Sequence, residues 1–290
     1  MAATIPAVVL DAKPTASFPL RYGIFQAANG PLDMSDPHMR NGGIKYVTAV
    51  CGEGFGYDIA CIGDQADKSS AWSENGTTVV TGAPFIVFAT LQCGTAGYTF
   101  EEEKALVMER LRSVEQSVVE EVFSTSANGQ SPGLITGDGI TTVTGAGDTV
   151  VQVLSELERA RYCGFTGNTA QYGPQAILHV AIPVLNALKQ EHLAEWDGTR
   201  WRTPMGTVIS AGCYANNDPA GAAPADGVFW MYLTGQTTIW RSSDQFVMDQ
   251  IAPVDGSLDR TTNQYMMLAE REYIVTYECG GFAKPVTLWT

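Results

Sequence analysis

The chain has 290 residues, 45% of them hydrophobic, which is long enough for one large domain or two smaller ones with a sizeable core. Acidic residues outnumber basic ones 31 to 17 and the formal net charge is -14, which disfavours a surface that grips nucleic acid through its phosphates. No run approaches the roughly 20 apolar residues of a membrane-spanning helix, so no membrane contact is expected.

The cysteines show no two-residue spacing, which disfavours a zinc knuckle. The first 20 residues lack the basic patch and apolar core of a secretory signal. We therefore expect folding in a reducing cytosol and free thiols. The six cysteines are Cys51, Cys61, Cys93, Cys163, Cys213 and Cys279.

Residues 1–43 contain five prolines mixed with glycine and asparagine, and neither helical nor strand periodicity is sustained. This pattern predicts an extended arm that gains order by lying on another surface. Deleting residues 1–30 is expected to leave a folded subunit that fails to assemble.

Two strand-like runs follow, Gly56–Ile62 and Thr78–Gln92, with a polar, glycine-containing stretch at 63–76 between them. The pattern predicts a long hairpin-like excursion. A loop of this length is more often functional than decorative.

A long helix is predicted from Thr99 to Ser124. Thr99 and Glu102 have the spacing of a capping box. Apolar residues at steps of three and four predict one buried stripe, and the glutamates of the opposite face are interpreted as solvated. A cation site is disfavoured, because calcium needs six to eight oxygens that converge from a loop. The stripe consists of Val107, Leu111, Val114, Val118 and Val122.

Shorter elements are predicted beyond a Gly/Ser/Thr-rich stretch at 128–147. Asp148 is a candidate N-cap for a helix that Arg159 and Arg161 close. The run Ile177–Ile182 predicts a buried strand, and Pro183 occupies a first helical position behind it. Another short strand is predicted at 207–210.

The C-terminal part is predicted to be rich in strands. A flexible segment at Ala215–Gly227 precedes Val228–Leu233, which is apolar on both faces and should be central in a sheet. Residues 273–279 and 282–289 predict a hairpin around Gly280 and Gly281, with Pro285 suggesting an edge position.

No catalytic, cofactor-binding or metal-ligating residues are predicted. The three histidines are His38, His179 and His192; we interpret His179 as a hydrogen-bonded structural residue and His192 as a surface residue. The glycines of 52–56 lack the spacing and flanking elements of a nucleotide-binding loop, and the sequon at 75–77 is interpreted as a turn. An enzyme with Cys163 or Cys213 as nucleophile and His179 as base remains a competing hypothesis, without a flanking signature.

Taken in order, these elements resemble the major capsid protein family of tailed bacteriophages, whose fold is shared with encapsulin shells. Local matches support the resemblance at Val150–Tyr162, Ile177–Val180, Thr203–Thr207, Trp230–Gly235 and Asn263–Arg271. It implies an α+β fold with an N-terminal arm (1–43), an extended loop (44–98), and a peripheral domain with the spine helix (99–147). An axial domain (148–290) follows, with its C-terminal strands returning toward the peripheral domain and residues 215–227 as a loop at the capsomer centre.

The resemblance implies a structural protein without enzymatic activity or cofactors, which assembles with itself as hexamers and pentamers into an icosahedral shell around double-stranded DNA. Portal and decoration proteins are implied as further partners, and any scaffolding is expected from a separate protein, since no charged helical segment precedes the arm. Packaged DNA would lie non-specifically at the inner wall, in a virion assembled in the host cytoplasm. Alternatives are an encapsulin-type compartment and a ring-forming tail or collar protein. Lys68 is the one hairpin-tip candidate for the isopeptide cross-link that some members form.

Overall fold

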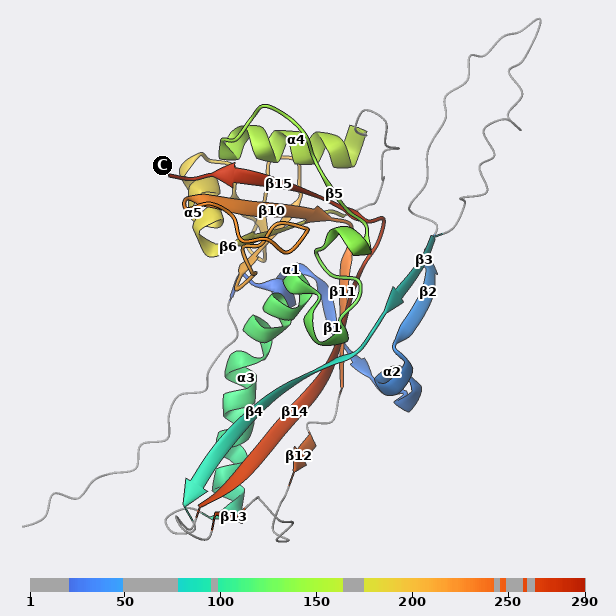
Figure 1. Ribbon diagram of the computed structural model, residues 1–290, viewed down its shortest axis with the longest axis vertical. Helices are drawn as coiled ribbons and strands as arrows, with labels where there is room; N and C mark the ends of the chain where they lie inside the picture. Colours follow the sequence, from blue (N-terminus) through green and yellow to red (C-terminus); the bar gives the residue numbers. More distant parts are fainter. Residues whose placement is uncertain are drawn as a thin grey trace, which may run out of the picture.

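The computed structural model describes residues 21–48, 78–94, 99–163, 175–242, 246–248, 258–259 and 264–289. The strand expected at Gly56–Ile62, the turns at 52–56 and 75–77, and Lys68 lie outside the described residues. Figure 1 shows two lobes: an upper one built on a seven-stranded sheet, and an elongated lower one in which a long helix lies beside long strands.

The long helix, α3, spans Phe100–Thr125, in agreement with the predicted range. Its capping box forms as predicted: the Thr99 hydroxyl accepts a hydrogen bond from the Glu102 N–H, and the Glu102 carboxylate accepts one from the Thr99 N–H. The helix ends at Ser126, whose φ of 52° is left-handed and breaks the helical repeat. A 3-10 turn, η2 (Ala127–Gly129), follows directly.

The buried stripe of α3 packs against one face of the lower sheet. In this sheet β4 (Phe85–Gly94) pairs antiparallel with β14 (Gln264–Tyr277) along its whole length. Val114 and Val118 of the predicted stripe are only partly buried. The fully or nearly fully buried apolar residues of α3 are Val107, Leu111, Val119, Val122 and Phe123.

Four further strands complete the lower sheet around β14. β11 (Thr237–Ser242), β12 (Phe246–Met248) and β13 (Leu258–Asp259) each pair antiparallel with β14. β1 (Asn29–Met34) pairs parallel with β11 and forms an edge.

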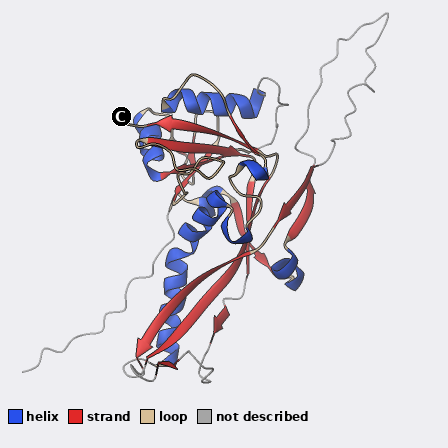
Figure 2. Cartoon of the chain, in the orientation of Figure 1, coloured by secondary structure: helices blue, strands red, loops and turns tan. Residues whose placement is uncertain are grey.

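The upper sheet places Val228–Thr234 in its interior, as predicted from the apolar residues on both faces of this run. Helices α4 (Val150–Cys163) and α5 (Ile182–Gln190) cover one face of the sheet, and the C-terminal turns of α3 lie toward the other (Figure 2). The strand order is β5 (Ile140–Thr142), β15 (Gly281–Thr287), β10 (Val228–Thr234), β6 (Ile177–Ala181), β9 (Val208–Gly212), β8 (Trp201–Arg202) and β7 (Glu195–Trp196). A second 3-10 turn, η3 (Thr136–Asp138), precedes β5.

The predicted C-terminal hairpin is wrong. β14 and β15 do not pair with each other, because β14 belongs to the lower sheet and β15 lies between β5 and β10 in the upper one. The chain changes sheets at Cys279 and Gly280, which have consecutive positive φ angles of 61° and 60°. The edge position suggested by Pro285 is also wrong, because β15 has a strand on each side; Pro285 itself lies beyond the pairing with β5, which ends at Ala283.

The run Thr78–Gln92 is two strands rather than one. β3 (Thr78–Gly82) pairs antiparallel with β2 (Ile44–Thr48), and the two strands form a ribbon. The break before β4 occurs where the Ala83 N–H donates to the Ser131 carbonyl, and Pro84 has no N–H to contribute to a ladder.

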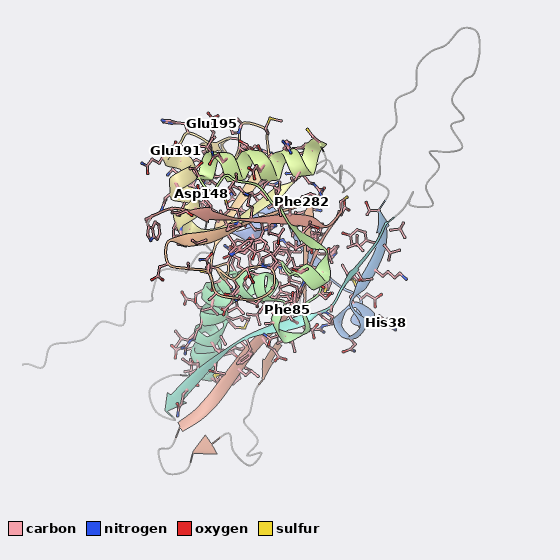
Figure 3. All side chains as sticks on the ribbon, turned by 45° about the horizontal axis from the view of Figure 1, so that its top comes forward. His38, Phe85, Asp148, Glu191, Glu195 and Phe282 are labelled. Atoms are coloured by element: carbon pink, nitrogen blue, oxygen red, sulfur yellow. The ribbon has the colours of Figure 1, made fainter. Side chains whose placement is uncertain are left out.

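Residues 21–43 are folded, so the expectation that the arm lacks helix and strand is wrong for this part. They form α1 (Ile24–Ala27), β1 and α2 (Pro37–Gly42). Elements of four to six residues are too short to show periodicity, and Ile24 and Met34 are held by burial against the rest of the chain. In Figure 3, His38 lies at the margin on α2, whereas Phe85 and Phe282 lie within the packed lobes.

Two helix starts differ from the prediction. A capping box between Thr149 and Gln152, rather than Asp148, begins α4. Pro183 is the second residue of α5, since Ala181 is its N-cap.

At the C-terminal end of α4, Arg161 is fully buried and donates to the Cys279 carbonyl, and burial lowers its pKa to about 10.

The free-thiol expectation is wrong for Cys279, which is disulfide-bonded, whereas Cys163 and Cys213 are free and exposed. Sequence spacing says nothing about which cysteines meet in space.

Among the helices of the described ranges, none is both long and apolar enough to cross a membrane.

Candidate assembly surface

The thiol–histidine hypothesis finds no support in the geometry around His179. Its ring is fully buried, with Nδ1 3.0 Å from the Tyr214 hydroxyl and Nε2 2.9 Å from the Thr234 hydroxyl, so neither nitrogen faces a thiol. Burial, with the charges of Glu120 and Glu121, raises the pKa of the Cys213 thiol. An activated nucleophile needs the opposite shift.

His179 makes stability depend on pH. Burial lowers its pKa from 6.5 to about 3, so the unfolded chain binds the proton more readily between these values. Stability is therefore lost as pH falls below about 6.5, by about 2 kcal/mol down to pH 5. We expect urea unfolding of His179→Gln to show a smaller loss over this range than the unsubstituted chain. The exposed His192→Gln should behave like the unsubstituted chain; equal pH dependence in all three would contradict the assignment.

The acidic residues of α3 are only in part the solvated surface expected from the sequence, since Glu101, Glu102 and Glu121 are exposed but three other glutamates are not. Glu103, Glu115 and Glu120 are buried. Their burial arises because α3 is covered by β4 and β14 of the lower sheet and also contacts α1. In the part of the chain that the structure describes, no three His, Cys, Asp or Glu side chains gather as a metal site.

Glu120 links three segments. Its carboxylate accepts hydrogen bonds from the Ile24 N–H at 2.8 Å, the Cys213 N–H at 2.6 Å and the Gln116 side-chain amide at 3.0 Å. It thereby joins α3 to α1 and to the end of β9. Burial raises its pKa despite these donors. Glycine is required at position 212, because a Cβ there would collide with this carboxylate.

The last turn of α3 extends this link toward the upper lobe. The Ser124 hydroxyl accepts a hydrogen bond of 2.9 Å from the Ala215 N–H. The Phe123 ring meets the His179 ring edge-on, with centroids 5.3 Å apart. The C-terminal end of α3 is therefore attached to the upper lobe by both polar and aromatic contacts.

A buried ion pair fastens the middle of α3 to the lower sheet. The Arg271 guanidinium lies 2.8 Å from the Glu115 carboxylate, and the Tyr273 hydroxyl donates to the same oxygen at 2.7 Å. Both charged side chains are 7% exposed. Since the two β14 residues face α3, this site sets the register between helix and sheet.

In the described ranges, exposed apolar side chains lie next to each other on the ribbon and on the lower sheet. On the β2–β3 ribbon, Val47 and Val79 are cross-strand partners and are 62% and 51% exposed. On the lower sheet, Ile86 and Phe88 are 48% and 61% exposed on the face opposite α3. Contiguous exposed apolar side chains are a feature of interaction surfaces.

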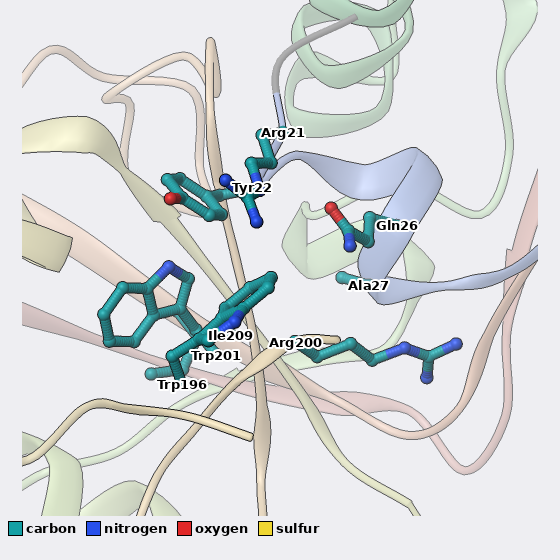
Figure 4. Close-up of a pocket in the computed structure, with 8 residues that line it drawn as sticks. All are labelled: Arg21, Tyr22, Gln26, Ala27, Trp196, Arg200, Trp201 and Ile209. Atoms are coloured by element: carbon teal, nitrogen blue, oxygen red, sulfur yellow. The ribbon is translucent and has the colours of Figure 1, made fainter. Parts of the chain in front are cut away.

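The start of the described chain is anchored on the upper lobe (Figure 4). The Tyr22 ring meets those of Trp196 and Trp201 edge-on, with centroids 5.5 and 5.8 Å away, and the Arg21 guanidinium lies 5.1 Å from the Trp196 ring. The remaining cavity of about 10 Å³ has room for roughly one water molecule. These ring contacts therefore serve as an anchor for the chain rather than as a ligand pocket.

Comparison with known proteins identifies the fold. No protein-family model and no curated protein sequence matches the chain. The capsid of an empty GTA particle matches over 99% of this chain and 95% of its own, with 12% identity and a TM-score of 0.50. Structures from Gordonia phage Cozz (98% and 91% covered) and Mycobacterium phage Ogopogo (95% and 97%) match with 11% identity and TM-scores of 0.51. At these identities the likeness establishes the fold, and the predicted α+β capsid fold is confirmed.

Proposed function

We propose that the chain is the structural subunit of an icosahedral shell that encloses the double-stranded DNA of a tailed phage. The fold match along nearly the whole chain is the observation that carries the proposal. A closed shell needs an elongated subunit that buries surface on several neighbours. The open apolar faces of the ribbon and of the lower sheet supply such surface.

The proposal also includes the arrangement of the subunits in the shell and the proteins that assist assembly. Hexamers and pentamers of one chain would form the shell, and separate scaffolding, portal and decoration proteins would assist in the host cytoplasm. The net charge of -14 favours an inner wall that holds DNA without binding it tightly. The role is structural rather than catalytic, and the domain boundaries expected from the sequence belong to this proposal.

Electron microscopy of the purified chain, expressed alone and with the proteins encoded beside it, tests the function. Closed icosahedral particles are expected. Open rings would instead favour the tail or collar alternative, and shells filled with a protein cargo would favour the encapsulin alternative. A monomer under every condition would contradict all three.

Removing residues 1–20 should leave a folded subunit whose yield of particles falls by about tenfold or more, since a lost intersubunit contact recurs in every copy. The deletion should not extend beyond residue 20. A deletion to residue 30 would also remove Ile24, which is buried and whose N–H donates to Glu120, so we expect that longer deletion to lower stability as well. Circular dichroism checks folding and sedimentation measures particles. A normal particle yield would exclude an assembly role for this segment.

A further inference from the structure

Cys279 stands where the chain passes from the lower sheet to the upper one. It is disulfide-bonded and buried. Its φ of 61° lies in the left-handed region, which favours glycine and in which a cysteine is uncommon. The covalent bond, rather than the local backbone, therefore accounts for a cysteine at this position.

The backbone around Cys279 is held on two sides. The neighbouring Glu278 N–H donates to the carbonyl of Gln236, in the β10–β11 connection, at 3.1 Å. From α4, the buried Arg161 donates to the Cys279 carbonyl at 3.1 Å. A segment joined to Cys279 by a disulfide is therefore fastened to a well-packed point between the two lobes.

Three of the other cysteines cannot be its partner. Cys163 and Cys213 are free. Cys93 is opposite Tyr265 in the β4–β14 register, at the far end of the long strand β14 from Cys279 (Figure 1). A strand rises about 3.3 Å per residue, so these two cysteines are roughly 40 Å apart, whereas a disulfide holds two Cα atoms within about 7 Å. The remaining candidates, both outside the described residues, are Cys51 and Cys61.

The described end of β2 favours Cys51. β2 ends at Thr48, whose hydroxyl donates to the Glu278 carboxylate. Cys51 follows Thr48 by three residues, which span about 10 Å at most, so it is within reach of Cys279. Cys61 stands ten residues further along the chain and has no described neighbour that brings it to this place.

We propose that Cys51 and Cys279 form a disulfide that fastens the β2–β3 ribbon to the boundary between the lobes after the protein has left the cytoplasm. The inference rests on the proposed function, which places assembly in a reducing cytoplasm, where thiols stay reduced. In the closing step two S–H bonds break and one S–S bond forms. Molecular oxygen takes up the two electrons and two protons and becomes hydrogen peroxide. The subunit thus assembles as the dithiol and is stabilised afterwards.

The bond lies within one chain and closes a loop that includes most of its length. In the chain-entropy account of disulfides, long loops give the largest stabilisation, because the unfolded chain loses the most freedom. The oxidised subunit is therefore more resistant to heat than the reduced one.

Peptide mapping of the full chain tests the pairing and its timing. One sample is alkylated with iodoacetamide at lysis, a second is exposed to air first, and both are digested without reductant. The air-exposed sample should contain one linked pair of peptides, with Cys51 and Cys279, and the first sample should have both residues alkylated. A pair of Cys61 with Cys279, or a link between two chains, would overturn the assignment. A bond already complete at lysis would overturn the timing.

Serine variants measure what the bond contributes. Cys51→Ser and Cys279→Ser should each lower the thermal midpoint of the air-exposed protein by about 10 °C. Neither should change that of the reduced protein by a comparable amount. The double variant should be no worse than the single ones, since all three lose the same bond. Cys213→Ser, which removes a free and exposed thiol, is the matched control and should have no effect. Equal midpoints for the oxidised and reduced unsubstituted chain would contradict the stabilising role.

Particles separate this inference from the shell function. Cys51→Ser should assemble with a normal yield, because the bond forms after assembly, but its particles should not gain heat resistance on exposure to air. A Cys51→Ser chain that folds but does not assemble would contradict the proposed order of events. Failure of the unsubstituted chain to assemble would count against the function, whereas the peptide map would still decide the pairing.

Discussion

Replacing Glu120 by alanine should lower the free energy of unfolding by about 3–5 kcal/mol, because two backbone N–H groups and one amide lose their acceptor inside the protein. These donors belong to Ile24, Cys213 and Gln116, and the carboxylate itself is fully buried. Glu120→Gln keeps one carbonyl acceptor but turns an NH₂ group toward a donor, so its loss should be intermediate. Urea unfolding monitored by circular dichroism measures the differences.

The adjacent exposed Glu121 provides the matched control. Glu121→Ala should change stability by no more than about 0.5 kcal/mol, since surface substitutions away from special features have small effects. A Glu120→Ala loss as small as that of the control would show that water replaces the carboxylate. The hydrogen bonds of Glu120 to α1 and to the upper lobe would then contribute nothing to the free energy of unfolding.

Replacing Arg271 by methionine should cost about 3–5 kcal/mol, the usual loss when one member of a buried ion pair is removed and the other charge stays behind. Among the residues that the structure describes, Glu115 would then keep the Tyr273 hydroxyl as its one hydrogen-bond partner. The combined Arg271→Met and Glu115→Leu substitutions should restore much of the loss, because no buried charge remains. Thermal and urea unfolding of the four chains complete a double-mutant cycle.

The pair between Arg40 and Glu272 is a natural comparison. It has a similar distance, 2.7 Å, but its side chains are 34% and 24% exposed, against 7% for both members of the buried pair. Arg40→Met should cost about 1 kcal/mol or less, since solvent screens the interaction. Equal losses at Arg40 and Arg271 would mean that burial does not determine the strength of these pairs.

Local patterns in the sequence predicted the parts of the fold that depend on near neighbours. The capping box of Thr99 and Glu102 is formed within one turn, and the stripe of α3 follows the helical repeat. Apolar residues on both faces of Val228–Leu233 placed this strand inside a sheet without any knowledge of its partners.

Sequence patterns gave wrong expectations for features that depend on distant segments. A pattern shows which face of a helix or strand is apolar, but it does not show which segment covers the opposite face. Acids on the polar face of a helix are usually solvated, which holds for Glu101 and Glu121, yet Glu120 is buried and receives an N–H from a residue 96 positions away. The predicted C-terminal hairpin is a second case. Side chains alternate as expected of strands in Tyr273–Cys279 and Phe282–Trp289, on either side of two glycines, but a tight turn can equally carry the chain from one sheet to another.

By itself, the sequence determined the long capped helix, the order of the elements and, through their resemblance to a known family, the capsid fold. Hydrogen bonds and side-chain spacing within a few residues are sufficient for the helix and for individual strands. Only the tertiary structure decided that Glu115 meets Arg271 across 156 positions, that Glu120 joins the lobes, and that Ile86 and Phe88 stay open. These contacts depend on how the chain brings distant segments together, and no local pattern of residues encodes that geometry.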